Sequence, residues 1–262
     1  MTASWVGTAD AYHRSVAQMC RGAVEPLLDA SDGLGGVVVA RRLLDAGSGT
    51  GVLGEAALAR DWRVDAVDLD AGMIAHLGER VPRIASRTGS MAALPYPAGA
   101  FDAIGACFSI NHADHPATVA AELRRVARPG APLAASVWPW QPTAMNSLWG
   151  EIMAATGTRP ERFALPAGEP FERTETGLSG LLSDAGWREV SAWRHGWTFE
   201  IEPVELWLGI EAGIATIGQA YAGADAVGRA RIRAEYERRT AELAIDGRLR
   251  FPVEAILAVG RA

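Results

Sequence analysis

The stretch at residues 43–54, LLDAGSGTGVLG, limits what this chain can fold into more than any other part of it. An apolar segment ends at its start, a segment of helical character follows it, and glycines fill the turn between them. Glycine lets the backbone adopt conformations barred to other residues and approach a ligand closely. Its glycines fit two nucleotide-binding patterns, G-x-G-x-x-G at positions 49, 51 and 54 and D-x-G-x-G-x-G beginning at Asp45.

The two patterns favour different ligands. The first is typical of NAD, whose pyrophosphate binds at a helix N-terminus behind the loop. The second suits S-adenosylmethionine (SAM), because Asp45 at the end of the strand can face the ammonium of its methionine part. Asp68 lies 19 residues after Gly49, where an acid can accept hydrogen bonds from the ribose hydroxyls of either ligand. These residues alone leave both ligands open.

Strand and helix patterns alternate along the first half of the chain. Apolar strands are expected at 37–46, 62–70, 101–110 and 131–140, and helices at 51–60, 71–80 and 116–127. This alternation predicts an α/β fold with a doubly wound, mostly parallel sheet, which binds ligands at the carboxyl ends of its strands. The glycine loop, Asp68 and the loop at 107–115 should therefore line one crevice.

The remaining segments complete one expected domain over residues 1–262. A helix at 9–30 precedes the cofactor-binding core at 37–138. Irregular and helical segments at about 141–175 and 202–246 are expected to form an α-rich lid over the crevice. C-terminal strands are expected at about 187–200 and 248–260, in a sheet of seven strands of which six are assigned here.

Composition narrows the function classes. The net charge is −6 and every one of the 25 basic residues is arginine, which argues against a nucleic-acid partner and excludes lysine chemistry. Only two cysteines, Cys20 and Cys107, are present, so neither a disulfide framework nor a zinc cluster is indicated. No apolar run reaches membrane-spanning length and the N-terminus lacks a signal-peptide pattern, so a cytoplasmic protein without a membrane partner is expected.

The region after the glycine loop carries a further ordered set of motifs. These are Gly89, Leu94-Pro95-Tyr96, Phe101-Asp102, His112 and Arg128-Pro129-Gly130. With the glycine loop and Asp68, the region at about 37–138 resembles the Rossmann-like class I SAM-dependent methyltransferases. Within them it is most similar to the ubiquinone/menaquinone methyltransferase-like (methyltransferase type 11) branch. The resemblance favours SAM over NAD and assigns Gly54 to helix packing.

The resemblance also implies which residues hold SAM. The methionine end would contact Asp45, Gly47, Ser48, Gly49, Gly51, Cys107 and Phe108, and the nucleoside end Asp68, Leu69, Met73, Ser90 and Met91. Tyr12 in the first helix would close over the cofactor. The sequence departs from the family at Ser90, where an acid is usual, so the contact to the adenine amino group is expected to be weaker or to come from the backbone.

Histidines are the candidates for catalysis. His112 follows the third of the four strands assigned above, over the expected methyl position, and could remove a proton from an acceptor; His13 is the second candidate. A pocket-shaping role for His112 remains equally open. A metal site within 111–115 is rejected, because no further donors are recognisable and Asp114 is better explained as part of the N-cap region of the helix at 116–127.

The chain is therefore expected to transfer a methyl group from SAM to a small, apolar or aromatic metabolite, at oxygen, carbon or nitrogen, in secondary or quinone-type metabolism. Part of an apolar acceptor pocket could come from the tryptophans Trp138, Trp140, Trp149, Trp197 and Trp207. Two alternatives stay open: an NAD(P)-dependent oxidoreductase that uses Gly49, Gly51 and Gly54, and a SAM-binding protein without transferase activity. A homodimer is left open.

Overall fold

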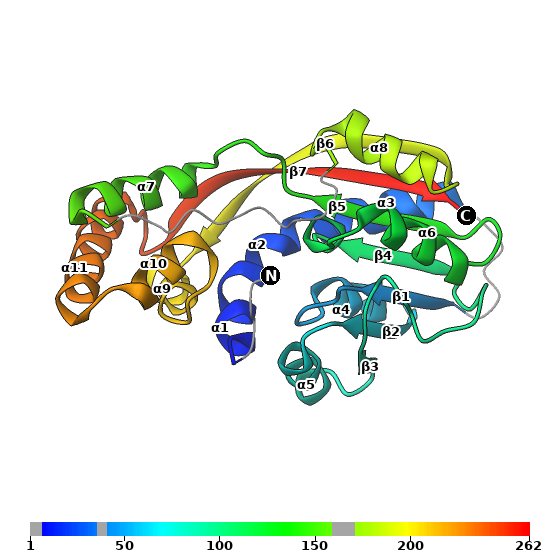
Figure 1. Ribbon diagram of the computed structural model, residues 1–262, viewed down its shortest axis with the longest axis horizontal. Helices are drawn as coiled ribbons and strands as arrows, with labels where there is room; N and C mark the ends of the chain where they lie inside the picture. Colours follow the sequence, from blue (N-terminus) through cyan, green and yellow to red (C-terminus); the bar gives the residue numbers. More distant parts are fainter. Residues whose placement is uncertain (1–6, 36–40, 159–170) are drawn as a thin grey trace.

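The computed structural model describes residues 7–35, 41–158 and 171–262, and it contains one seven-stranded sheet (Figure 1). The strand order is β3-β2-β1-β4-β5-β7-β6. The strands are β1 Arg42–Ala46, β2 Arg63–Asp68, β3 Ala85–Thr88, β4 Ala103–Cys107, β5 Pro132–Val137, β6 Arg188–Ile201 and β7 Leu249–Arg261. All pairs are parallel except those that β7 makes with β5 and β6. The predicted α/β fold with a mostly parallel sheet is confirmed.

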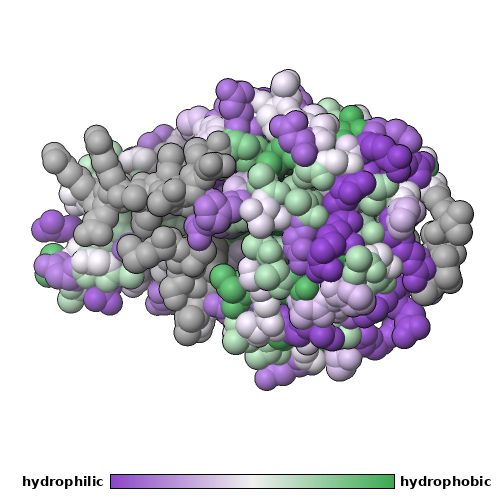
Figure 2. All heavy atoms as spheres, turned by 45° about the vertical axis from the view of Figure 1, so that its right-hand side comes forward, coloured by the Kyte–Doolittle hydropathy of each residue, from purple (hydrophilic) through white to green (hydrophobic). Residues whose placement is uncertain are grey.

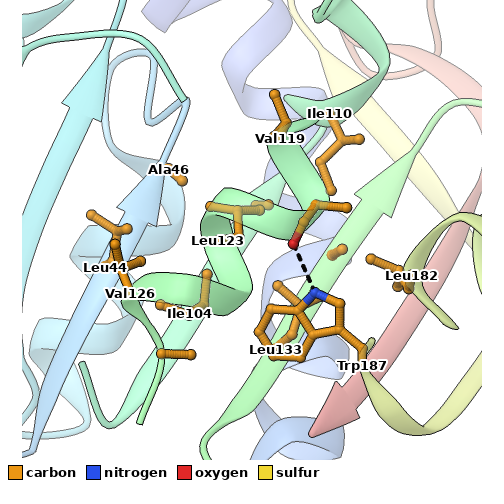
Figure 3. Packing of buried hydrophobic residues seen from close by; sticks show 14 of the residues in the cluster. Leu44, Ala46, Ile104, Ile110, Val119, Leu123, Val126, Leu133, Leu182 and Trp187 are labelled. Carbon is orange, nitrogen blue, oxygen red and sulfur yellow. Dashed lines mark hydrogen bonds between the residues drawn. The ribbon is translucent and has the colours of Figure 1, made fainter. Parts of the chain in front are cut away.

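Helices cover both faces of this sheet. One face carries α3 Val24–Leu34, α4 Val52–Ala59 and α5 Ala71–Arg80, which share a buried apolar cluster with β1 and β2. The other face carries α6 Pro116–Val126 and α8 Glu175–Asp184. Figure 3 shows this second cluster, in which the Trp187 indole donates a hydrogen bond to the Ala120 carbonyl (3.0 Å). The central strands are buried on both sides, which is why they are almost entirely apolar.

The single helix expected at 9–30 is broken. The chain forms α1 Ala9–Arg14, α2 Val16–Cys20 and a 3₁₀ turn at Arg21–Ala23 (η1) before α3 begins. The break lies at Ser15, whose ψ of −87° is far from a helical value and whose hydroxyl bonds to the Ala11 carbonyl (2.5 Å). The apolar spacing that predicted one helix is kept in the separate pieces.

Four further helices form a lobe with a separate core. These are α7 Ala144–Thr156, α9 Pro203–Glu211, α10 Ala215–Gly223 and α11 Ala226–Leu243, which pack against the distal halves of β6 and β7. Figure 1 shows this lobe beyond one end of the sheet, next to α1 and α2. An ion pair between Arg14 and Glu205 (2.7 Å) ties α1 to α9. The segments expected as a lid lie largely in this lobe; part of the first, residues 159–170, is outside the described residues.

On the face seen in Figure 2, hydrophilic residues are spread between smaller groups of hydrophobic ones. Many charges on α11 are paired with each other, as in Arg238 with Glu235 (2.7 Å) and with Glu242 (2.7 Å). Within the described ranges, no helix combines the length and the apolar composition that a membrane crossing requires.

Candidate functional site

A cavity of about 520 Å³ opens at the carboxyl ends of β1, β2 and β4. The chain order of the strands reverses between β1 and β4, which is where sheets of this kind bind ligands. Twelve of the thirteen predicted cofactor residues line it: Tyr12, Asp45, Gly47, Ser48, Gly49, Asp68, Leu69, Met73, Ser90, Met91, Cys107 and Phe108. Residues that the sequence did not single out for this site complete the wall, among them Cys20 from α2.

The glycine loop forms the floor of this cavity. Gly47, Gly49 and Gly51 all have positive φ values, of 67°, 52° and 90°. A Cβ on Gly47 would collide with Ser109, and one on Gly49 would lie 3.4 Å from the Tyr12 ring. The loop therefore requires glycine for its backbone conformation and for its closeness to its neighbours.

Gly51 is the one predicted cofactor residue that does not line the cavity. It is the left-handed N-cap of α4, and a Cβ there would collide with Leu77 of α5. Its place in the motif is explained by the turn into the helix and by helix packing. The expectation that Gly51 contacts the ligand directly is therefore replaced by a supporting role.

Asp45 is buried at the end of β1, with 1% of its surface exposed. Its carboxylate accepts a hydrogen bond from the Gly54 backbone N–H (2.9 Å) in the first turn of α4. Burial raises the pKa of Asp45 to about 7, and this one hydrogen bond opposes the rise only in part. A positively charged ligand group in the cavity would favour its ionised form.

Asp68 stands at the end of β2 on the cavity wall. One carboxylate oxygen accepts from the Gly49 N–H (2.7 Å) and the other from the Asp70 N–H (2.9 Å). A carboxylate offers about four acceptor positions, so both oxygens can still accept from a ligand. Burial raises the pKa of Asp68. Asp70 caps α5 through the Met73 N–H (2.9 Å), which confirms its predicted role.

Tyr12 reaches the cavity from α1 and lies over the glycine loop. Burial raises the pKa of its hydroxyl, and the nearby Cys20 and Cys107 add to the rise. Its position agrees with the expectation that an aromatic side chain from the first helix covers this site.

The walls fit SAM. The Ser48 hydroxyl is buried on the cavity wall and has no hydrogen-bond partner among the described residues, as expected of a group kept for a ligand. Leu69 leaves 63% of its surface exposed beside Asp68, where it can cover a nucleoside base. Acids for an ammonium and a ribose, a glycine floor and apolar side walls therefore meet in one space.

Of the two candidate catalytic histidines, only His112 lines the cavity. It ends the 3₁₀ turn Ile110–His112 (η2) after β4. Loss of hydration around the ring lowers the pKa of His112, and the positive charge of Arg173 lowers it further. The imidazole is therefore neutral at pH 7 and able to accept a proton.

His13 is directed elsewhere. Its Nδ1 lies 3.1 Å from the Thr50 hydroxyl, and its ring centroid is 5.2 Å from that of His76. Burial and the positive charge of Arg80 lower the pKa of His13 to about 4. Because it does not line the cavity, the structure gives no support to its expected second place in catalysis.

The loop at 111–115 also differs from expectation. The N-cap of α6 is His115, and the helix has no side-chain capping bond, so Asp114 lies in the expected N-cap region without capping the helix. Asp114 and His115 instead lie on the cavity wall. In the part of the chain that the structure describes, no three His, Cys, Asp or Glu side chains are grouped to hold a metal ion.

Aromatic rings continue from the cavity along the sheet. Phe108, whose φ is 53°, stacks on Trp138 with a centroid distance of 4.0 Å and an interplanar angle of 14°. Trp197 of β6 follows at 5.9 Å from Trp138. Trp149 and Trp207, by contrast, are buried in the helical lobe. Trp138 and Trp197 pack against the core of that lobe from its edge, and Trp140 is 49% exposed. None of the five tryptophans considered for an acceptor pocket is among the residues that line the cavity.

Comparison with known proteins agrees with this site. A family model described as a methyltransferase domain matches residues 44–135. A demethylmenaquinone methyltransferase of Beutenbergia cavernae is 32% identical over 163 residues, which cover 57% of this chain and 66% of that protein. Another, of Renibacterium salmoninarum, is 33% identical over 167 residues, covering 60% of this chain and 70% of that protein. The chain thus spans about two thirds of the length of these two relatives.

A solved structure shows the same fold with little sequence identity. The phosphoethanolamine N-methyltransferase 2 of Haemonchus contortus, in complex with phosphomonomethylethanolamine and S-adenosylhomocysteine, aligns with a TM-score of 0.52 at 14% identity. The alignment covers 90% of this chain and 52% of that one. The comparisons do not favour the nicotinamide alternative. This chain belongs to the class I SAM-dependent methyltransferases, and its cofactor is SAM.

Proposed function

We propose that this chain transfers the methyl group of SAM to a small apolar or aromatic metabolite, giving S-adenosylhomocysteine. The observation that carries the proposal is the stack of Phe108 on Trp138 at the cavity. Phe108 is the member of this stack that lines the cavity, and His112 lines it from the same loop. A flat, apolar acceptor would find ring surface there together with a proton acceptor.

The cofactor residues have separate proposed tasks. Asp45 faces the ammonium, the glycine floor admits the methionine part, and Asp68 accepts hydrogen bonds from the ribose hydroxyls. Leu69 and Met73 cover the adenine. When bound, SAM supplies an electrophilic methyl group on a sulfonium, and much of its transfer can depend on alignment and on exclusion of water.

His112 is the proposed general base where the acceptor must lose a proton. Its lowered pKa keeps the ring unprotonated at neutral pH, at the cost of reduced basicity. A phenolic or enolic hydroxyl, which gives up its proton more easily than an alcohol, would suit such a base. The names of the two demethylmenaquinone methyltransferases support an aromatic, quinol-like acceptor and a place in quinone-type or secondary metabolism. A cytoplasmic location and the absence of nucleic-acid partners remain part of the proposal.

The first experiment measures binding by calorimetry with SAM, S-adenosylhomocysteine, NAD and NADP. We expect both adenosyl ligands to bind and both nicotinamides to fail. Methyl transfer is then followed as S-adenosylhomocysteine formed with aromatic hydroxyl compounds such as 1-naphthol. A SAM-binding protein without transferase activity would bind the adenosyl ligands and produce none.

His112→Ala tests the catalytic assignment. We expect SAM affinity to stay within about twofold while turnover falls by roughly 10²-fold or more, the usual range for a general base. His195→Ala is the matched control, because His195 is a half-buried histidine on β6 that does not line the cavity; its Nε2 lies 3.2 Å from the Gly22 carbonyl oxygen and its ring stacks on Trp197. Equal turnover in the two variants would reduce His112 to a pocket wall.

A further inference from the structure

Arg173 is a half-buried cation next to the loop that carries His112. Its guanidinium carbon lies 4.1 Å from the centroid of the Trp140 ring, and its Nη2 donates to the Asn111 carbonyl oxygen (3.2 Å). Within residues 7–35, 41–158 and 171–262, no carboxylate lies within ion-pair distance of it. Burial lowers the pKa of Arg173, as expected of a cation that has lost water without gaining a counter-charge.

The position of Arg173 links it to the reaction. Asn111, to which it is bonded, directly precedes His112, and the positive charge of Arg173 acts on the His112 ring. The cation therefore lies close to the proposed base, in the segment that leads into α8. It takes no part in the proposed handling of SAM.

Asn111 adds a second unsatisfied group at the same place. It is 6% exposed, and neither its side-chain nitrogen nor its side-chain oxygen has a hydrogen-bond partner among the described residues. A buried polar group without a partner costs about 1–3 kcal/mol, so such an amide is rarely left unused. It offers donors and an acceptor within one residue of His112.

Trp140 sets the orientation of the guanidinium. The indole is 49% exposed, an unusual state for a side chain of its size, and it stands two residues beyond Trp138. A guanidinium that lies on an aromatic face keeps the donors at its edge available, all in one plane. A planar carboxylate can accept from two of these donors at once, which a spherical or tetrahedral anion matches less well.

We infer that the methyl acceptor carries a carboxylate, and that Arg173, held on Trp140 and supported by Asn111, binds this group next to the methyl-accepting atom. The inference rests on the proposed function and narrows its substrate class to aromatic or enolic acids. The apolar body of the acceptor would lie toward Trp138 and its reacting atom toward His112. Neutral analogues would lose the contact to Arg173 while keeping the contact to the rings.

The test compares two probes that differ only in the carboxylate, 1-hydroxy-2-naphthoate and 1-naphthol. Each is titrated by calorimetry into the full chain saturated with S-adenosylhomocysteine, at low and at high salt. We expect the naphthoate to bind at least about tenfold more tightly, with a preference that shrinks as salt rises. Arg173→Gln should abolish the preference and leave the affinity for naphthol unchanged, and Arg173→Lys should give an intermediate value because it keeps the charge without the planar fork.

Arg229→Gln is the matched control, because Arg229 also donates to a single backbone carbonyl, that of Ala224 (2.9 Å), on an exposed helix. A wild-type preference near one would overturn the inference, whether or not the arginine variants fold. So would an Arg173→Gln variant that weakens both probes by the same factor, since this would mean that Arg173 only ties the loop at 109–113 to the segment before α8. A different result would contradict the proposed function itself: the protein would bind S-adenosylhomocysteine, but in the methyl-transfer assay with SAM neither the acidic nor the neutral probe would be methylated.

Discussion

Replacing Asp45 by Asn is expected to stabilise the cofactor-free protein at alkaline pH and to weaken its hold on SAM. Asparagine has nearly the same shape, and its side-chain oxygen can still accept from the Gly54 N–H, as the carboxylate does. What is lost is the charge. Because Asp45 is 1% exposed, ionising it in the folded chain is costly.

The magnitude follows from the shift of the pKa of Asp45 from 3.8 to about 7. Between these two values the folded chain keeps a proton that the unfolded chain has released, so stability falls as pH rises and becomes constant above pH 7. Each pH unit in this window is worth about 1.4 kcal/mol, so the wild type should lose roughly 2–3 kcal/mol between pH 5 and pH 8 through this group alone. Asp45→Asn has no carboxyl group at this position and should not lose stability in this way. The difference in the free energy of unfolding between the variant and the wild type should therefore grow by the same roughly 2–3 kcal/mol from pH 5 to pH 8.

The assay is urea unfolding of the cofactor-free protein at four pH values from 5 to 8. Asp61→Asn is the matched control, because Asp61 is exposed and its positive φ of 63° is one that asparagine tolerates. Its pH profile should follow that of the wild type. Parallel profiles for Asp45→Asn and the wild type would show that Asp45 does not change its charge in this range, and would refute the reasoning.

Cofactor binding gives a second readout of the same group. If Asp45 must be ionised to face the ammonium, binding removes a proton from it, and affinity for SAM should rise with pH up to about pH 7. Calorimetry in buffers of different ionisation enthalpy measures the released proton directly. Asp45→Asn should bind SAM more weakly and release no proton. Binding without proton release in the wild type would place the ammonium elsewhere.

The remaining predictions concern the glycine loop and the ribose. Asp68→Ala should lower the affinity for S-adenosylhomocysteine roughly 10- to 100-fold, because hydrogen bonds to a charged group are worth about 1.5–3 kcal/mol; unchanged affinity in calorimetry would contradict the ribose assignment. Gly47→Ala should destabilise the protein in urea unfolding by about 2 kcal/mol more than Gly99→Ala. The two glycines have nearly equal φ values (67° and 66°), but a new Cβ at 47 meets Ser109 and one at 99 meets nothing within 4 Å. Equal losses would show that the loop can move aside.

The core of the fold follows from the sequence because its signals are local. Parallel strands buried on both faces are short apolar runs, and α5 was expected at the residues where it is found, 71–80. β3 carried no such signal: its residues, ASRT, are polar, since it is an edge strand whose side chains are mostly exposed. Apolar spacing also continued through Ser15, so the break there could not be read from the pattern.

The functional site was likewise predicted only where the sequence signal is local. Tyr12 and His13 were both expected at the ligand, but successive residues on a helix point about 100° apart, and only Tyr12 faces the cavity. Which of the two would do so depends on how α1 is oriented relative to α2 across the break at Ser15. Cys20 of α2 also lines the cavity, and this too depends on how the N-terminal helices pack in the folded chain rather than on a local sequence pattern.

The cofactor half and the acceptor half of this site are encoded differently. Nearly all of the predicted SAM contacts fall between Asp45 and Phe108, in loops that follow successive strands, so a single ordered pattern reveals them. The groups proposed for the acceptor come from the loop at 109–113, from the end of β5 and, with Arg173, from the segment before α8, and only the fold brings them together. No local pattern marks such a set. It follows that changes at Trp140 and Arg173 should alter which acceptor is used while SAM affinity stays constant, because neither side chain lines the cavity that holds the cofactor residues.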